Sequence, residues 1–117
     1  MSGKRPFEDR TPYTISKTGV IGFTRTLAVE LAGDGVIVDA VRPGRVEGPR
    51  LDAVIGEQAR NRGVGVDEVE AESRSVSPQD AFVRAGDVAD AVLWLRSERA
   101  DRVTGQDLNV TAGTVMY

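Results

Sequence analysis

The fold class of this 117-residue chain is decided by one stretch, VIVDAV at residues 36–41, which leads directly into Arg42, Pro43 and Gly44. The stretch is short, rich in β-branched side chains and nearly continuous in apolar character. That pattern is typical of a strand covered on both faces, as in a parallel sheet. Pro43 and Gly44 interrupt it, so we predict a strand over residues 36–41 that ends in a turn.

The segments on either side of this strand have helical or strand-like spacing. A helix is predicted to begin where Thr11 caps and Pro12 takes the first helical position. Asp67 and Glu70 resemble a capping box for a short helix. Helices separate two strands, which indicates a parallel pair in an α/β layer. The predicted elements are a loop at 1–10, a helix at 11–33, a strand at 36–41, helices within 51–78, a helix at 87–97 and a strand at 107–111.

The composition excludes several classes of function. The chain has no cysteine and no histidine, which rules out disulfides, thiolate chemistry and imidazole metal ligation. Its net charge of -3 argues against nucleic-acid and anionic-membrane surfaces. Because no apolar run approaches the roughly 20 residues that span a bilayer, we expect a cytoplasmic protein. Three arginines, Arg42, Arg45 and Arg50, lie close together around Glu47, a pattern of a solvated or ligand-facing loop.

Tyr13 and Lys17 are the candidates for proton chemistry. They lie four residues apart on the first predicted helix, which places both on one face. A tyrosine ordinarily has a pKa of about 10, and a nearby ammonium favours its phenolate form. A phenol in such a place can exchange a proton with a substrate oxygen. Taken alone, the pair also fits an ordinary solvated helix face.

The context of this pair is more specific. The chain contains YTISK at residues 13–17, VDAVRPGRV at 38–46 and TGQDLNV at 104–110. In order and separation, these motifs resemble the short-chain dehydrogenase/reductase family over essentially the whole chain. The resemblance implies a partial Rossmann-like, doubly wound α/β fold, with about two parallel strands and three to four helices.

The resemblance also implies roles for individual residues. Tyr13 matches the general acid/base tyrosine of the family. Lys17 matches the lysine that assists it and hydrogen-bonds the ribose of NAD or NADP. Pro43, Gly44 and Val46 match the loop that lies against the nicotinamide, with the Val46 backbone meeting the carboxamide. The location agrees with the rule that ligands of open α/β sheets bind beyond the carboxyl ends of the strands.

The chain departs from the family in several places. Gly48 stands where many members have a threonine that contacts the cofactor, so any contribution there must come from the backbone. No glycine-rich phosphate loop precedes the first helix. Counting back to the usual catalytic serine leads just before Met1, and Ser2 falls two residues too late. The sequence thus reads as the C-terminal half of a family domain, and Met1 is expected to match an internal methionine of a longer enzyme.

Three functions follow from this reading. The first is an NAD(P)-dependent oxidoreductase that acts on a small alcohol or carbonyl substrate. The second is a catalytically silent remnant that serves as an oligomerisation or binding module. The third is one half of a split enzyme. We expect a homo-oligomer (a dimer or tetramer), no nucleic-acid or membrane partner and no metal. The segment at 51–78 corresponds to the family's variable substrate-covering region.

Overall fold

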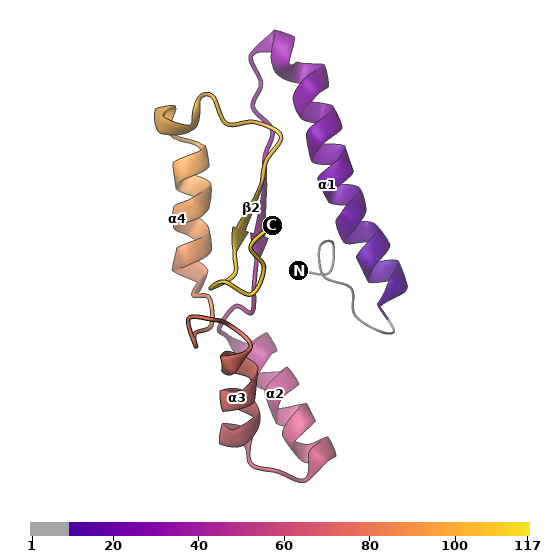
Figure 1. The fold of residues 1–117 in the computed structure, drawn as a ribbon, viewed down its shortest axis with the longest axis vertical. Helices are drawn as coiled ribbons and strands as arrows, with labels where there is room; N and C mark the ends of the chain where they lie inside the picture. Colours follow the sequence, from indigo (N-terminus) through magenta and orange to yellow (C-terminus); the bar gives the residue numbers. More distant parts are fainter. Residues whose placement is uncertain (1–9) are drawn as a thin grey trace.

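The computed structural model describes residues 10–117 (Figure 1). The loop predicted at 1–10, apart from Arg10, lies outside the described residues, as do Met1 and Ser2. Two short 3₁₀ turns, at Ala32–Asp34 and Glu98–Ala100, follow the first and last α-helices. The main elements are α1 (Thr11–Leu31), β1 (Ala40–Pro43), α2 (Pro49–Arg62), α3 (Val66–Ser75), α4 (Ala85–Leu95) and β2 (Asp107–Val110).

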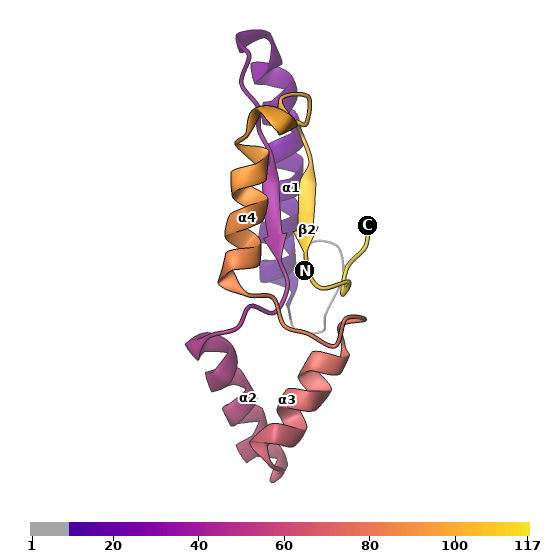
Figure 2. The same cartoon turned by 90° about the vertical axis from the view of Figure 1, so that its left-hand side faces the viewer.

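The two strands form a parallel pair between two helices. Ala40 pairs with Asp107, and the register continues to Pro43 opposite Val110. Figures 1 and 2 show α1 on one face of the pair and α4 on the other. The two parallel strands and four α-helices within residues 10–117 confirm the predicted partial α/β class.

The predicted start of the first strand is wrong. β1 begins at Ala40, and Val36 and Ile37 are 44% and 41% exposed. The amide of Val38 donates to the Thr104 hydroxyl, and the Val38 carbonyl accepts from Gly105. The backbone ahead of β1 therefore binds a turn, because the ladder partner β2 begins only at Asp107. The β-branched run favoured an extended chain, but extension is a strand only where a neighbour pairs with it.

The helix starts also differ from those predicted. Thr11 is already helical and Arg10 occupies the N-cap without a side-chain hydrogen bond. The N-cap of α3 is Gly65, so Asp67 and Glu70 form no capping box. α4 begins at Ala85, two residues before the predicted start. There the Asp87 carboxylate accepts a hydrogen bond from the Arg84 amide at 2.8 Å and fixes the first turn.

Helices α2 and α3 form a hairpin that projects from the sheet (Figure 2). The hairpin has a core of its own, in which the buried Ile55, Ala59 and Val69 pack together. Because the hairpin projects from the sheet, the molecule is elongated and measures 57 × 29 × 22 Å. The sheet and the hairpin meet where β1 ends, which is where the sequence motifs place the candidate site.

Candidate active site

The helix α1 presents Tyr13 and Lys17 in its first two turns. Pro12 fixes the helical start, and the hydroxyl of Ser16 donates to the Tyr13 carbonyl at 2.7 Å. The Lys17 ammonium lies 5.3 Å from the centroid of the Tyr13 ring, within the range of a cation–π interaction. The Tyr13 side chain is 45% exposed. The helix therefore holds a cation against a phenol that solvent and ligands can reach.

The carboxyl end of β1 passes close to the chain that follows β2. The Gly44 amide donates to the Val110 carbonyl at 2.8 Å and extends the strand pairing by one residue. A Cβ atom at Gly44 would lie 2.9 Å from the Cα atom of Thr111. The two backbones are too close for a side chain, so only glycine fits at the residue that follows β1.

The backbone of Val46 is left with unused hydrogen-bonding groups. Val83 donates to the Arg45 carbonyl at 2.8 Å and accepts from the Glu47 amide at 2.9 Å. This is a parallel bridge between Val46 and Val83, in which the flanking residues make the bonds. Among the described residues, the amide and carbonyl of Val46 itself have no hydrogen-bond partner. Backbone groups at partly buried positions are usually paired, so the amide and carbonyl of Val46 are free to hydrogen-bond a ligand.

Two adjoining cavities share Tyr13. The smaller, about 170 Å³, lies between α1 and β1. The larger, about 450 Å³, lies between α1, the turn after β1 and the start of α2. Lys17 and Pro43 line the smaller cavity, while Gly44, Val46 and Gly48 line the larger one. The structure thus brings all six residues singled out by the sequence to one place.

Gly48 explains one departure from the family pattern. Its φ is +136°, in a region that side-chain-bearing residues rarely adopt. It is the N-cap of α2, and Pro49 follows at the first helical position. A threonine, which is β-branched, would be strained in this conformation. The backbone conformation that starts α2 therefore requires glycine at the position where many family members have threonine.

The sequence motifs did not identify the α2 residues of the larger cavity. Arg50, Leu51 and Val54 line it together with Tyr13. Arg50 had been noted only as one of three nearby arginines. The position of these residues immediately after the Gly48-Pro49 helix start is the signal that could have placed them at the site.

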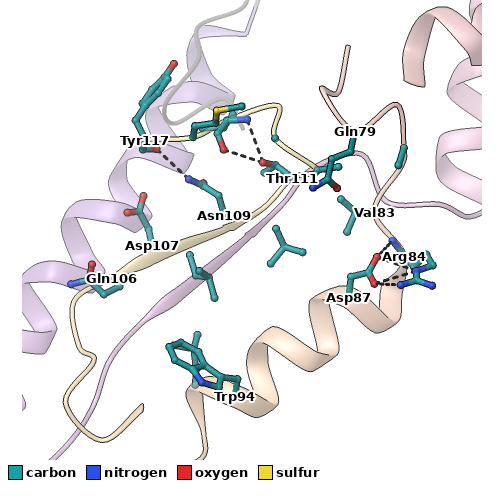
Figure 3. A pocket seen from close by; sticks show the side chains of 18 of the residues that line it. Gln79, Val83, Arg84, Asp87, Trp94, Gln106, Asp107, Asn109, Thr111 and Tyr117 are labelled. Carbon is teal, nitrogen blue, oxygen red and sulfur yellow. Dashed lines mark hydrogen bonds and ion pairs between the residues drawn. The ribbon is translucent and has the colours of Figure 1, made fainter. Parts of the chain in front are cut away.

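A third cavity, about 1140 Å³, is larger but lies elsewhere (Figure 3). Neither Tyr13 nor Lys17 lines it. β2, α4 and the C-terminal residues form its walls, where Asn109 donates from its side-chain amide to the Tyr117 carbonyl at 3.2 Å. Trp94 lies on the opposite wall from these residues in Figure 3. The size of this cavity does not make it the candidate active site, since none of the motif residues that carry proton chemistry reaches it.

Two further searches concern residues 10–117. In that range we find no group of three or more acidic side chains close enough together to hold a metal ion. Nor does any helix there have the length and apolar character required to span a membrane.

The comparisons with known proteins agree with this geometry. A family profile described as Enoyl-(Acyl carrier protein) reductase matches residues 1–115. The 3-oxoacyl-acyl-carrier-protein reductase FabG of Thermotoga maritima is 36% identical over 107 residues, which cover 92% of this chain and 39% of that protein. The D-beta-hydroxybutyrate dehydrogenase of Rhizobium meliloti is 32% identical over 105 residues, which cover 89% of this chain and 41% of that protein.

Solved structures give the same result. Sorbitol-6-phosphate 2-dehydrogenase from Erwinia amylovora matches with a TM-score of 0.90 at 31% identity, covering 99% of this chain and 46% of that one. A variant of actinorhodin polyketide ketoreductase with NADPH matches with a TM-score of 0.88 at 36% identity, covering 99% and 45%. The chain therefore belongs to the short-chain dehydrogenase/reductase family. It spans less than half the length of these relatives.

Proposed function

We propose that this chain carries the acid/base part of an NAD(P)-dependent oxidoreductase that interconverts a carbonyl and an alcohol. One observation carries the proposal. Tyr13 is shared by a cavity that Lys17 lines and by a cavity that Val46 lines, and the backbone amide and carbonyl of Val46 have no hydrogen-bond partner among the described residues. A proton donor, a cation and a residue with unpaired backbone groups therefore line two cavities that meet at Tyr13.

Tyr13 performs the proton step in this proposal. In the reductive direction its phenol donates a proton to the substrate oxygen while a hydride reaches the carbonyl carbon, and the products are the alcohol and a phenolate. The Lys17 ammonium, held 5.3 Å from the ring centroid, stabilises the negative charge that develops. In the oxidative direction the phenolate takes the proton back.

The residues of the site fit a nicotinamide nucleotide, NAD or NADP. When bound, that cofactor supplies or accepts the hydride. A primary carboxamide needs both a hydrogen-bond donor and an acceptor, and Val46 offers an unpaired amide and carbonyl on one residue. The Lys17 ammonium can donate to ribose hydroxyls from the same side as Tyr13. Pro43, Gly44 and Gly48 contribute backbone and little bulk at this edge of the sheet, which leaves room for a flat ring.

The hairpin of α2 and α3 is proposed to choose the substrate. Leu51 and Val54 bring apolar side chains to the larger cavity, and Val54 is 44% exposed. The Arg45 guanidinium holds the hairpin in place by donating to the Ser73 hydroxyl at 2.7 Å. A substrate that enters beside Tyr13 would meet these side chains first.

We also propose that the chain self-associates through α1. The three most exposed large apolar side chains of this helix are Ile15 (67%), Phe23 (65%) and Val29 (79%). Exposed apolar groups gathered on one element favour association. Light scattering at micromolar concentration tests this, and a monodisperse monomer would contradict it.

Binding of reduced nicotinamide mononucleotide to the 117-residue chain tests the cofactor placement. We expect the backbone amide of Val46 to show one of the largest NMR chemical-shift changes, with changes also at Tyr13 and Lys17. Adenosine monophosphate serves as the control, because it has a phosphate but no carboxamide. If the largest changes lay on β2 and α4 around the cavity of Figure 3, the proposed cofactor site would be wrong.

A further inference from the structure

The three arginines that cluster in the sequence have different fates in the structure. Arg42 pairs with Asp107 at 3.3 Å, and Arg45 donates to the Ser73 hydroxyl at 2.7 Å. Arg50 has neither an ion pair nor a side-chain hydrogen bond within residues 10–117. The first two are therefore structural, and of the three only Arg50 has a guanidinium without a partner within residues 10–117.

Arg50 lies in the same cavity as Tyr13. It is the second residue of α2, directly after the Gly48-Pro49 start, and lines the volume of about 450 Å³. The cavity has one acidic lining residue, Glu47, among those described. That carboxylate lies near Arg84, whose pKa is raised chiefly by hydrogen bonds to Asp87 and also by Glu47. Arg50 is therefore a cationic lining residue of this cavity that forms no ion pair with any carboxylate of residues 10–117.

We propose that Arg50 is a specificity-determining residue that binds a carboxylate or phosphate group of a molecule bound in the cavity beside Tyr13. A guanidinium stays charged at all physiological pH values and matches the two oxygens of such a group with paired N–H donors. The inference rests on the proposed function, because it assigns the chemistry of the same cavity. Two sources of the anion are open to it, a keto acid substrate and the phosphate of the nicotinamide nucleotide.

Two matched pairs of probes distinguish the sources. The first pair is a keto acid of four to six carbons and its uncharged amide. The second is nicotinamide mononucleotide and nicotinamide riboside, which lacks the phosphate. Each pair differs by one oxyanion group, so a ratio of dissociation constants isolates that group. NMR titration of the 117-residue chain measures each constant without any requirement for hydride transfer.

Arg50→Gln removes the charge, and Arg50→Lys retains it without the paired donors. Arg60→Gln is the control, because Arg60 lies on the same helix, is exposed, and does not line the cavity. Circular dichroism checks that each variant keeps the helix content of the native chain. Since Arg50 is exposed, none of the substitutions removes a buried contact.

The native chain is expected to bind the anionic member of one pair about 3- to 10-fold more tightly, the scale of a partly exposed charged hydrogen bond. Arg50→Gln should bring that ratio close to one, Arg50→Lys should give an intermediate ratio, and Arg60→Gln should leave it unchanged. If Arg50→Gln loses the preference for the anionic probe only in the keto acid pair, the anion belongs to the substrate. If it loses the preference only in the nucleotide pair, the anion belongs to the cofactor.

The inference is overturned if neither pair shows a preference, if the preference survives Arg50→Gln, if Arg60→Gln abolishes it equally, or if no probe binds. Its failure is separate from that of the proposed function. If anion binding depends on Arg50 but the site never transfers hydride, the anion site is supported and the proposed oxidoreductase activity is wrong.

Discussion

The guanidinium of Arg42 lies 3.3 Å from the carboxylate of Asp107 and joins the two strands of the sheet. Both side chains are nearly buried, at 11% and 9% exposed, and Arg25 of α1 approaches the same carboxylate at 3.6 Å. The strand that leads into the candidate site is therefore tied to β2 and to the helix that carries Tyr13. The two ion pairs therefore connect α1, β1 and β2.

Asp107→Asn should destabilise the fold, because it leaves the buried Arg42 guanidinium without a counter-charge. Removing one partner of a buried pair costs about 3–5 kcal/mol, and somewhat less, about 2–4 kcal/mol, is expected at this partly covered site. Urea denaturation measures the change in the free energy of unfolding. Glu72→Gln is the control, since Glu72 pairs with Arg62 at 2.6 Å where both side chains are exposed. Equal losses in the two variants would show that Asp107 has no special role.

Gly44→Ala tests the close approach between β1 and Thr111. The added methyl would meet the Thr111 Cα atom at 2.9 Å, so the two backbones must separate. We expect a loss of about 1–3 kcal/mol in the free energy of unfolding. Gly56→Ala is the opposite case, because Gly56 is inside α2 and its new Cβ would meet only the end of Arg60 at 3.6 Å. That variant should gain up to about 1 kcal/mol. A neutral Gly44→Ala would remove the packing argument for the turn.

The start of α4 should make the fold sensitive to acid. The pKa of Asp87 is held below its ordinary value of 3.8, chiefly by side-chain hydrogen bonds from Arg84 and then by the Arg84 amide. A carboxyl with a lowered folded-state pKa stabilises the fold fully above its unfolded-state pKa, and the contribution is lost as the pH falls through the folded-state value. Asp87→Asn should therefore flatten the dependence of the thermal midpoint on pH below about 4. An unchanged slope would show that Asp87 is uncoupled from folding.

NADH should bind the 117-residue chain no more tightly than reduced nicotinamide mononucleotide does. The sequence has no glycine-rich loop ahead of a helix that could hold the adenylate phosphates, so the second half of the dinucleotide adds no contact. We expect both dissociation constants, measured by fluorescence titration, to lie above the micromolar range. Saturable micromolar binding of NADH alone would reveal a phosphate site that the sequence does not show.

Local patterns predicted the ends of α1, α4 and β2 to within two residues, but not the start of β1. α1 and α4 follow from apolar residues repeated at helical spacing, and that repeat depends on the helix alone. The start of β1 could not be predicted in the same way, because it depends on where β2 begins. The capping box at Asp67 and Glu70 was wrong because Gly65 is the N-cap and α3 begins at Val66, so Asp67 already lies inside the helix.

The candidate site shows the same division. Tyr13, Lys17 and the turn at Pro43 and Gly44 were identified because their motifs are continuous in the sequence. The resemblance also singled out the Val46 backbone, but the lack of a hydrogen-bond partner for its amide and carbonyl could not be predicted, since it results from the bridge to Val83 in a distant segment. Arg50 also required the structure, because neither its place beside Tyr13 nor its lack of an ion pair within residues 10–117 can be read from the sequence.

The central claim is that Tyr13 exchanges a proton in an NAD(P)-dependent reaction. A chimera tests it most directly. Actinorhodin ketoreductase matches 99% of this chain with 45% of its own length. Its dinucleotide-binding half, which this chain lacks, would be joined to the present sequence. Oxidation of NADPH would then be followed with a panel of ketones. We expect a turnover that falls by about 10²- to 10⁴-fold in Tyr13→Phe, while NADPH binding is unchanged. A chimera that binds NADPH and reduces none of the ketones, or one in which Tyr13→Phe is as active as the parent, would contradict it.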